Sequence, residues 1–213
     1  MTPIYMHMQP NVAVEPGMSH FWGNPELPDG FEFPTATDEY GEEWHLRFIC
    51  QINLADIAPW DKDNILPHSG LLSVFADIDY YMGESDETSI MGFIGDRQYV
   101  KVAYFKDINR LHEVCLVDIN DEPISPEPIA ITFDNHHEPL SDEHALLAHP
   151  DHRPWETWDK PYDNWEILLQ IDSCEGSDFN LNFMDCGVLN ILISPKDLRN
   201  RRFDRVRPIV LST

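Results

Sequence analysis

The chain of 213 residues is 42% hydrophobic and 11% aromatic, which is enough for the core of one large domain or two small ones. Its 38 acidic and 14 basic residues give a net charge of −24, and this sign of charge argues against binding to nucleic acid or anionic membranes. No apolar run is long enough to cross a bilayer, and residues 1–12 lack the basic and apolar regions of a signal peptide.

The cysteines agree with a reducing compartment. None of the four is in CxxC spacing, and three lie in or beside apolar, strand-like runs. We therefore expect reduced, mostly buried thiols in a cytoplasmic protein. Cys50 and Cys186 lie beside the repeated motifs described below, and we expect burial to leave both thiols unreactive.

The predicted elements begin with a loop-rich first third. Residues 21–34 are rich in proline and glycine, so we expect an extended surface segment that is neither a helix nor a central strand. Residues 44–52 then alternate as a strand, and residues 54–60 suit a short helical turn that ends at Pro59. Residues 70–81 are apolar almost throughout, which is typical of a strand buried on both faces.

The middle of the chain predicts three strands and one helix. The strands are expected at residues 99–105, 112–119 and 128–133, and the proline-rich stretch 120–128 joins the last two. Residues 140–149 predict a helix, because a serine can cap it and acidic side chains follow in its first turn.

The C-terminal part predicts two buried strands, a helix and an edge strand. Residues 165–172 and 187–193 are the two apolar strands. Residues 194–203 predict a helix, because they begin with a capping serine and a proline at the first helical position. Residues 205–211 predict an edge strand. The proline within them has no N–H to donate to a neighbouring strand, so it is poorly placed in a central strand.

Two stretches of the chain occur twice. Residues 48–53 match residues 167–172 at an offset of 119, and residues 70–76 match residues 187–193 at an offset of 117. The first pair shares a polar glutamine inside an apolar run, and the second pair shares an initial glycine. Two half-length units with the same order of strands and loops indicate an internal duplication.

This repetition sets the fold class that we expect. We predict one α+β domain, residues 1–213, made mainly of antiparallel sheet with a few short helices. Its two related halves would span residues 19–118 and 129–213, with similar sheets or half-sheets packed together.

The two repeated glutamines, Gln51 and Gln170, lie on strands that are apolar on both sides. A buried amide must find hydrogen-bond partners, so each glutamine could bind the backbone of a neighbouring loop and fix the duplicated arrangement. Alternatively, the two amides could bind a ligand in a pocket between the repeats, with Asp185 as a third candidate. A small-molecule-binding protein or an enzyme is therefore the alternative to a protein-binding module.

Six segments, in this order, resemble the pattern of the YwqG-like family of bacterial proteins of unknown function. They are GNPELP, LRFICQINLADI, LPHSGLLSVF, HALLAHP, WEILLQIDS and FMDCGVLNILISPKDL. The resemblance covers roughly residues 19–207, nearly the whole chain. It implies an α+β fold in a bacterial cytoplasm and brings no catalytic residues. Members are similar in context to proteins that accompany bacterial toxin systems, which favours a protein-binding role.

No motif in the chain has the spacing of a known catalytic mechanism. GxGxxG, the phosphate-binding GxxxxGK[ST] and the nucleophile elbow GxSxG are all missing from the sequence. The acidic stretches near residues 61–64 and 77–79 lack the glycine and glutamate of a calcium loop. We therefore predict no enzymatic activity and no required cofactor.

Histidines are concentrated between residues 136 and 152, where five of the ten occur among several carboxylates. Imidazole and carboxylate are ligands for divalent metals, and His144 and His149 are the candidates here. Their spacing of five does not align them on one helix face, so we favour a solvated connection without a metal.

The net charge favours a basic protein as partner. An acidic surface speeds association with a basic partner, as in an immunity-type protein that occludes a cationic toxin. Trp22, Trp155 and Trp158 are candidate anchors within the proline-rich segments 21–34 and 154–165. The alternative is that these aromatic side chains belong to the core and that the charge only keeps the protein soluble.

Five arginines lie within residues 199–207 of this acidic chain. They could form a basic binding strip. With so many carboxylates available, ion pairs within the protein are the favoured interpretation.

Overall fold

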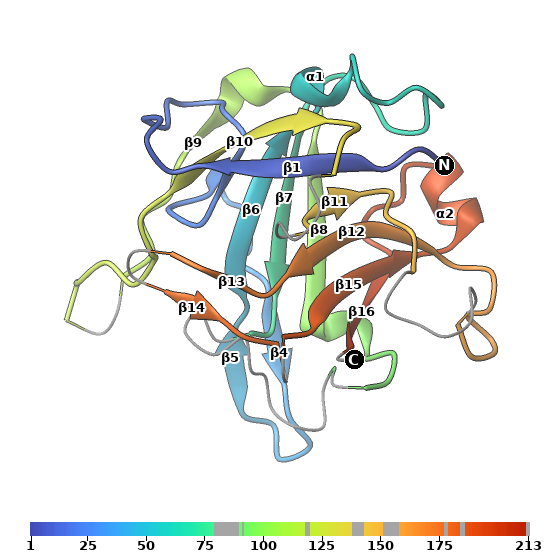
Figure 1. Ribbon diagram of the computed structural model, residues 1–213. Helices are drawn as coiled ribbons and strands as arrows, with labels where there is room; N and C mark the ends of the chain where they lie inside the picture. Colours follow the sequence, from blue (N-terminus) through green and yellow to red (C-terminus); the bar gives the residue numbers. More distant parts are fainter. Residues whose placement is uncertain are drawn as a thin grey trace.

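The computed structural model describes residues 1–78, 90, 92–117, 120–137, 143–150, 158–176, 179–183 and 186–211. One ten-stranded sheet dominates these residues, and all neighbouring strands in it are antiparallel (Figure 1). The strands, in spatial order, are β16 (Val206–Leu211), β15 (Val188–Ile193), β12 (Glu166–Asp172), β11 (Ala145–Leu146), β1 (Ile4–Gln9), β10 (Ile129–Asp134), β2 (His20–Phe21), β6 (Arg47–Asn53), β7 (Leu71–Ala76) and β8 (Val100–Phe105).

The sheet twists so strongly that it nearly closes on itself. Figure 1 shows β1 crossing in front of β6, β7 and β8 at a steep angle, as expected when the right-handed twist accumulates over many strands. The two end strands, β8 and β16, come into contact, although the sheet order does not pair them. The result is a nearly barrel-shaped sheet around an apolar interior.

Short elements decorate this sheet. Three two-stranded sheets are formed by β3 (Glu26–Pro28) with β9 (Leu111–Glu113), by β4 (Thr35–Thr37) with β5 (Glu43–His45), and by β13 (Cys174–Glu175) with β14 (Asn180–Leu181). The described residues contain two short α-helices, α1 (Leu54–Ile57) and α2 (Pro195–Arg199), and two 3₁₀ turns, η1 (Arg97–Tyr99) and η2 (Ile108–Arg110). The mainly antiparallel sheet with a few short helices is therefore confirmed.

Local sequence explains both helices. The side chain of Asn53 accepts a hydrogen bond from Ala55 N (3.1 Å) and caps α1. Ser194 caps α2 by accepting from Asp197 N (3.0 Å), and Pro195 occupies the first turn, as the sequence predicts. No helix in the described residues is long and apolar enough to span a membrane.

Apolar side chains form three clusters, one inside the curled sheet and two on its outer surface. The inner cluster collects side chains from both ends of the sheet order, including Val74 of β7 and Ile191 of β15. One outer cluster packs around Phe48 and Phe75, and the other packs around Ile167 and Leu192. Because strands β7 and β15 face a cluster on each side, all six residues of each are buried, as their apolar sequences predict.

Two elements differ from the sequence predictions. The helix expected at residues 140–149 is wrong for its described part, because Ala145 and Leu146 form β11 between β1 and β12. The next residue, Leu147, has φ 53°, which a right-handed helix does not allow, and its N–H donates to Leu168 O (3.0 Å). Strand β1 was not expected, although it lies near the middle of the sheet.

Smaller differences concern an expected strand and the thiols. Within residues 112–117, the described part of the strand predicted at 112–119, only the end of β9 and an isolated bridge between Val117 and Pro123 are formed. Cys50 and Cys174 are buried as expected, whereas Cys115 and Cys186 are exposed. Cys186 has φ 54° in a turn, which directs it away from the apolar run that follows.

Candidate functional site

The first repeated glutamine, Gln51, is completely buried and uses its whole amide for hydrogen bonds within the protein. Its Nε2 donates to Met18 O (3.0 Å) and to Glu26 Oε1 (2.8 Å), and its Oε1 accepts from Glu26 N (3.0 Å). These bonds tie β6 to Met18, which precedes β2, and to Glu26, the first residue of β3. With both amide hydrogens engaged, Gln51 has no donor left for a ligand.

The second glutamine, Gln170, is also buried but has fewer partners. Its Nε2 donates to Glu143 O (2.9 Å), while its Oε1 has no partner among the described residues. Asn190, which lies opposite on β15, likewise keeps an unpartnered Oδ1 there. Asp185 lies outside the described residues. Neither glutamine lines the pocket described below or the cavity beside β8, so these residues do not form an open ligand pocket there.

The two candidate metal ligands lie in different environments. His144 is buried against the ring of Phe21 (centroids 4.9 Å apart), and its Nδ1 accepts a hydrogen bond from Asp172 N (3.1 Å). The proton of the neutral ring is therefore assigned to Nε2. His149 is exposed, and the described residues contain no group of three His, Cys, Asp or Glu side chains that could hold a metal ion.

Burial lowers the pKa of His144 to about 4, below the ordinary value of 6.5. Because the folded-state pKa is the lower one, the unfolded chain takes up the proton first as the pH falls below 6.5. Stability is then lost at about 1.4 kcal/mol per pH unit until the pH reaches the folded-state pKa. Between pH 6.5 and pH 5 we expect His144 to contribute a loss of about 2 kcal/mol.

Urea unfolding at several pH values measures this contribution as the difference between the wild type and His144→Gln. The variant should show a shallower fall in stability toward pH 5 than the wild type. His149→Gln changes an exposed histidine and should keep the wild-type slope. Equal slopes for wild type and His144→Gln would show that His144 is not a buried neutral imidazole.

The tryptophans expected at a partner surface lie in the core where the structure describes them. Trp22 is 1% exposed and packs against Phe179 (ring centroids 5.0 Å apart). Trp158 is 3% exposed and donates from Nε1 to Trp165 O (3.1 Å). Trp155 lies outside the described residues. Trp22 belongs to the cluster inside the sheet, and Trp158 belongs to a cluster on its outer face. Both are therefore core residues and are unavailable as anchors.

The C-terminal arginines largely pair within the protein, as favoured from the sequence. Arg202 binds the carboxylate of Asp204 through Nε (3.2 Å) and Nη2 (3.3 Å). Arg205 Nη1 lies 4.0 Å from Asp197 Oδ1, and Arg207 Nη1 lies 3.7 Å from Asp96 Oδ2. These pairs leave little of residues 202–207 to act as a basic strip.

The hairpin formed by β4 and β5 carries the most exposed large hydrophobic side chain in the described residues. Tyr40, at its tip, is 84% exposed. The flanking acidic residues are Asp38, Glu39, Glu42 and Glu43. In Figure 1 the hairpin extends away from the body of the sheet. The sequence TDEYGEE contains a turn glycine and could have indicated this hairpin, but the surrounding prolines led us to expect only a loop.

Hydrogen bonds order the tip of this hairpin and hold its base on the body. Asp38 Oδ1 accepts from the N–H of Tyr40 (2.9 Å) and of Glu42 (2.8 Å), which fixes the turn. At the base, Trp44 Nε1 donates to Asp77 Oδ1 (2.7 Å), and Thr37 N donates to Gln98 Oε1 (3.3 Å). The exposed tyrosine and carboxylates are therefore held on a structured support.

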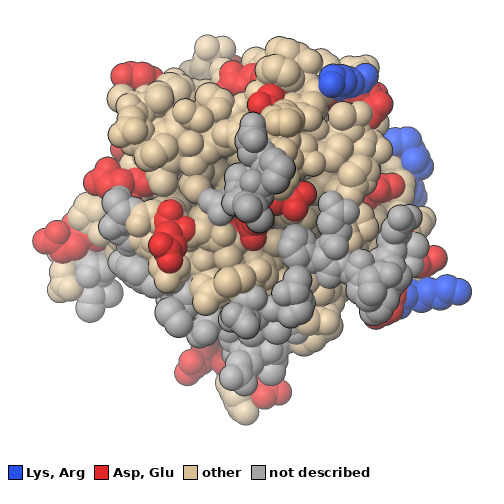
Figure 2. Space-filling model, in the orientation of Figure 1, with Lys and Arg blue, Asp and Glu red and all other residues tan. Residues whose placement is uncertain are grey.

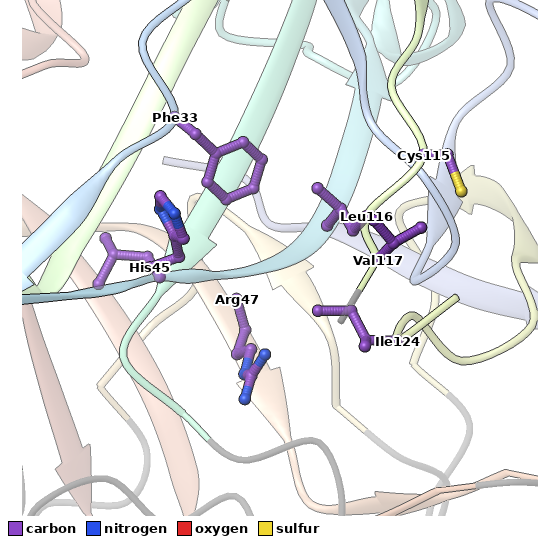
Figure 3. A pocket seen from close by; sticks show the side chains of 8 residues that line it. Phe33, His45, Arg47, Cys115, Leu116, Val117 and Ile124 are labelled. Atoms are coloured by element: carbon purple, nitrogen blue, oxygen red, sulfur yellow. The ribbon is translucent and has the colours of Figure 1, made fainter. Parts of the chain in front are cut away.

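A pocket of about 290 Å³ lies at the base of the hairpin (Figure 3). The side chains of His45 and Arg47 lie on one wall, and those of Val117 and Ile124 lie across from them. The full lining is Phe33, His45, Leu46, Arg47, Cys115, Leu116, Val117 and Ile124. Val117 (43%) and Ile124 (38%) are partly open to solvent, so the apolar lining continues onto the surface. This volume is at the lower end of small-ligand pockets and suits an apolar side chain.

The comparisons with known proteins give a family. No curated protein matches the chain. The family model described as "Domain of unknown function (DUF1963)" matches residues 19–210, which include every strand of the large sheet except β1 and the last residue of β16. The chain therefore belongs to the DUF1963 family.

Proposed function

We propose that this protein is a non-enzymatic binding module that docks a basic protein through the β4–β5 hairpin and the pocket at its base. The observation that carries the proposal is the ordered tip, on which a highly exposed tyrosine is surrounded by four carboxylates. Tyrosine is enriched at the energetic centres of protein interfaces, because it buries a large area at a small entropic cost.

Charge supports a basic partner. The net charge of −24 creates a field that attracts cationic proteins over long distances. Figure 2 shows acidic side chains spread over the visible face, whereas lysines and arginines lie toward the side of α2. A partner that approaches the hairpin would therefore meet carboxylates, while its own acidic surfaces would be repelled.

The pocket supplies the apolar part of the same interface. Val117 and Ile124 are exposed next to the hairpin base, and an apolar side chain of the partner could displace water from this lining. A specific interface usually has polar groups, such as these carboxylates, at its rim and an apolar contact at its centre.

The setting of this interaction belongs to the same proposal. Following the resemblance to the YwqG-like family, we infer a bacterial, cytoplasmic protein. In its narrower form the proposal assigns it an immunity-type role. It would then cover a cationic, nucleic-acid-directed toxin by presenting carboxylates where phosphates would bind.

Tip variants test the proposed interface. We expect Tyr40→Ala combined with Gln at positions 39, 42 and 43 to weaken partner binding at least about tenfold, because anchor and charges are lost together. Asp38 stays unchanged, since its carboxylate holds the turn. The control replaces three exposed acidic residues elsewhere, Glu15→Gln, Asp159→Asn and Glu175→Gln, and therefore removes equal charge.

Both variants are compared with the wild type by affinity capture from the source cell at about 50 mM and about 300 mM salt, followed by calorimetry with the purified partner. A basic protein that is held by the wild type and the control, but released by the tip variant, supports the proposal. Equal capture by the tip variant, or an acidic captured protein, would contradict it.

We also propose that the large sheet arose by duplication. The sheet order reads the same from both ends when β1, β2, β6, β7 and β8 are matched with β10, β11, β12, β15 and β16. The β6–β7 register shifts between Phe48 and Cys50, and the β12–β15 register shifts between Ile167 and Leu169, at positions 119 residues apart. An experimental structure in which the neighbours of β6 (β2 and β7) and the neighbours of β12 (β11 and β15) do not superpose as matched pairs would rule this out.

Backbone details at the ends of β2 and β11 support the same proposal. Trp22 has φ 56° and Leu147 has φ 53°, although neither is a glycine. The N–H of Trp22 donates to Ile49 O (2.8 Å), and the N–H of Leu147 donates to Leu168 O (3.0 Å). Two such unusual conformations with equivalent bonds are expected when one ancestral turn is kept in both halves.

A further inference from the structure

The pocket at the base of the hairpin has two walls of different chemistry. Arg47 and His45 form a nitrogen-rich wall, whereas Val117 and Ile124 across from them are apolar (Figure 3). An apolar side chain alone would match only the second wall. The guanidinium of Arg47 is always charged and has five N–H donors in a planar fork, which suits a carboxylate in addition to any other contact that it makes. The pocket therefore fits an occupant that carries both an apolar group and a carboxylate.

The nitrogen-rich wall is held by the sheet and by an aromatic contact. Arg47 is the first residue of β6 and pairs with Ala76 of β7. The ring of His45 lies edge to face with Phe33 (centroids 5.5 Å apart), and Phe33 packs in turn on the buried Phe75 (5.1 Å). Both side chains that could meet a carboxylate are thus positioned before any ligand arrives.

The apolar wall is also tied together by hydrogen bonds. Ile124 N donates to Leu116 O (3.0 Å), and Val117 bridges to Pro123. Leu116 N donates to Asn24 Oδ1 (3.2 Å), which joins this wall to the chain that follows β2. Val117 and Ile124 are nevertheless open to solvent, so a ligand can reach them.

Strand β5 connects the acidic tip of the hairpin to the pocket. Its first and last residues, Glu43 and His45, are exposed, whereas Trp44 between them is half-buried. Alternate residues of a strand share a face and lie about 7 Å apart. The carboxylate of Glu43 therefore belongs to the same face as the pocket, and a ligand along this face passes from a negative group to the nitrogen-rich wall.

The size of the pocket limits which part of a partner can supply both groups. Its volume of about 290 Å³ suits one large residue rather than several. An internal Asp or Glu beside an apolar residue would need at least two residues, whose side chains face opposite sides of an extended chain. A C-terminal residue carries a carboxylate and a side chain on the same Cα. Every protein has such a group, including a strongly basic one.

We propose that the pocket binds the C-terminal residue of the basic partner, and that this residue is apolar. Its carboxylate would accept hydrogen bonds from Arg47 and His45. Its side chain would pack on Val117 and Ile124, and the basic residues before it would lie over Glu43. This inference rests on the proposed function, because it takes the hairpin and the pocket as one interface.

The experiment uses a fluorescent six-residue peptide of lysine and glycine that ends in leucine, with binding to the whole protein followed by anisotropy at about 50 mM salt. We expect the C-terminal amide to bind at least about tenfold more weakly than the free acid, because it loses the charge-assisted bonds. Long-range charge alone predicts the opposite order, since amidation makes the peptide more positive and the protein carries −24. Glycine in place of the final leucine should also weaken binding about tenfold.

Protein variants assign the carboxylate to the pocket. Arg47→Gln should weaken the acid form at least about tenfold and the amide form less than about threefold. The change makes the protein more acidic, so a weaker general attraction to a basic peptide does not explain such a loss. Arg199→Gln removes the same charge from an exposed position in α2 and should change neither form more than about threefold. The acid and amide forms on the wild type give the same test without any substitution.

The outcomes separate this inference from the proposed function. The tip variant should weaken both peptide forms by the same factor, because it acts on the basic residues before the last one. Equal binding of acid and amide, or no binding of the acid, overturns the C-terminal proposal; if the tip variant still weakens a peptide that binds, the hairpin interface stands. A preference for the acid that the tip variant leaves at full affinity supports the pocket and contradicts the hairpin. N-acetyl-leucine that binds as tightly as the peptide would assign the pocket to a free apolar acid and overturn the proposal.

Discussion

Replacing Gly70 by alanine is expected to lower the free energy of unfolding by about 4 kcal/mol. Gly70 has φ +92°, a conformation that strains any other residue. An added Cβ would also lie 2.5 Å from Phe105 O and 2.7 Å from Tyr104 Cε2. Strand β8 cannot move aside easily, because it pairs with β7 along its whole length.

Gly30→Ala separates the two causes. Gly30 has a similar φ of +72°, but an added Cβ would meet nothing within 4 Å. We expect this control to cost only about 1 kcal/mol, the backbone term alone. Urea denaturation of both variants at neutral pH measures the difference. Similar losses for the two glycines would mean that the contact with β8 relaxes and that φ alone decides the cost.

Removal of the buried amide at Gln51 is the second large effect that we expect. Gln51→Leu should cost about 3 kcal/mol, because the half-buried Glu26 N and Met18 O lose their partner. The carboxylate of Glu26 would lose the hydrogen bond from Gln51 Nε2 and keep the one from Gly17 N (2.6 Å). The chain on both sides of β2 would then be held less firmly on β6.

Gln170→Leu is the matched control, since this side chain occupies the corresponding place on β12. It makes one hydrogen bond, to Glu143 O, and its Oε1 has no partner among the described residues. A cost of about 1 kcal/mol is expected, because one bond is lost and one unpartnered oxygen is removed. Chemical denaturation of the two variants should therefore show a clear difference, and a larger cost at Gln170 would contradict this account.

The long apolar strands could be predicted from the sequence because their signal is local. Residues 70–76 and 187–193 are apolar at successive positions, and both faces of these strands are indeed buried. Helix α2 was predictable for the same reason, since Ser194 and Pro195 act within one turn. By contrast, β11 has two residues and exists only because β1 and β12 lie on either side of it, so its helix-like composition was misleading.

The candidate site was less accessible to sequence reasoning. The walls of the pocket come from residues 33–47 and 115–124, which are far apart in the chain, and the second wall has almost no regular structure. Trp22 lies in a proline-rich segment that suggested exposure, yet its positive φ turns the chain so that the indole enters the core. Tyr40 was recognisable only by the glycine-containing acidic turn around it.

The position of β1 has a consequence for how the protein folds during synthesis. Both neighbours of β1, β10 and β11, follow it by more than half of the chain. The ribosome therefore releases β1 long before any strand can pair with it, and Ile4 and Met6 must wait exposed until residues 129–146 emerge. The middle of the sheet is thus completed late, and a nascent chain stalled before residue 129 would present an unpaired apolar strand to chaperones.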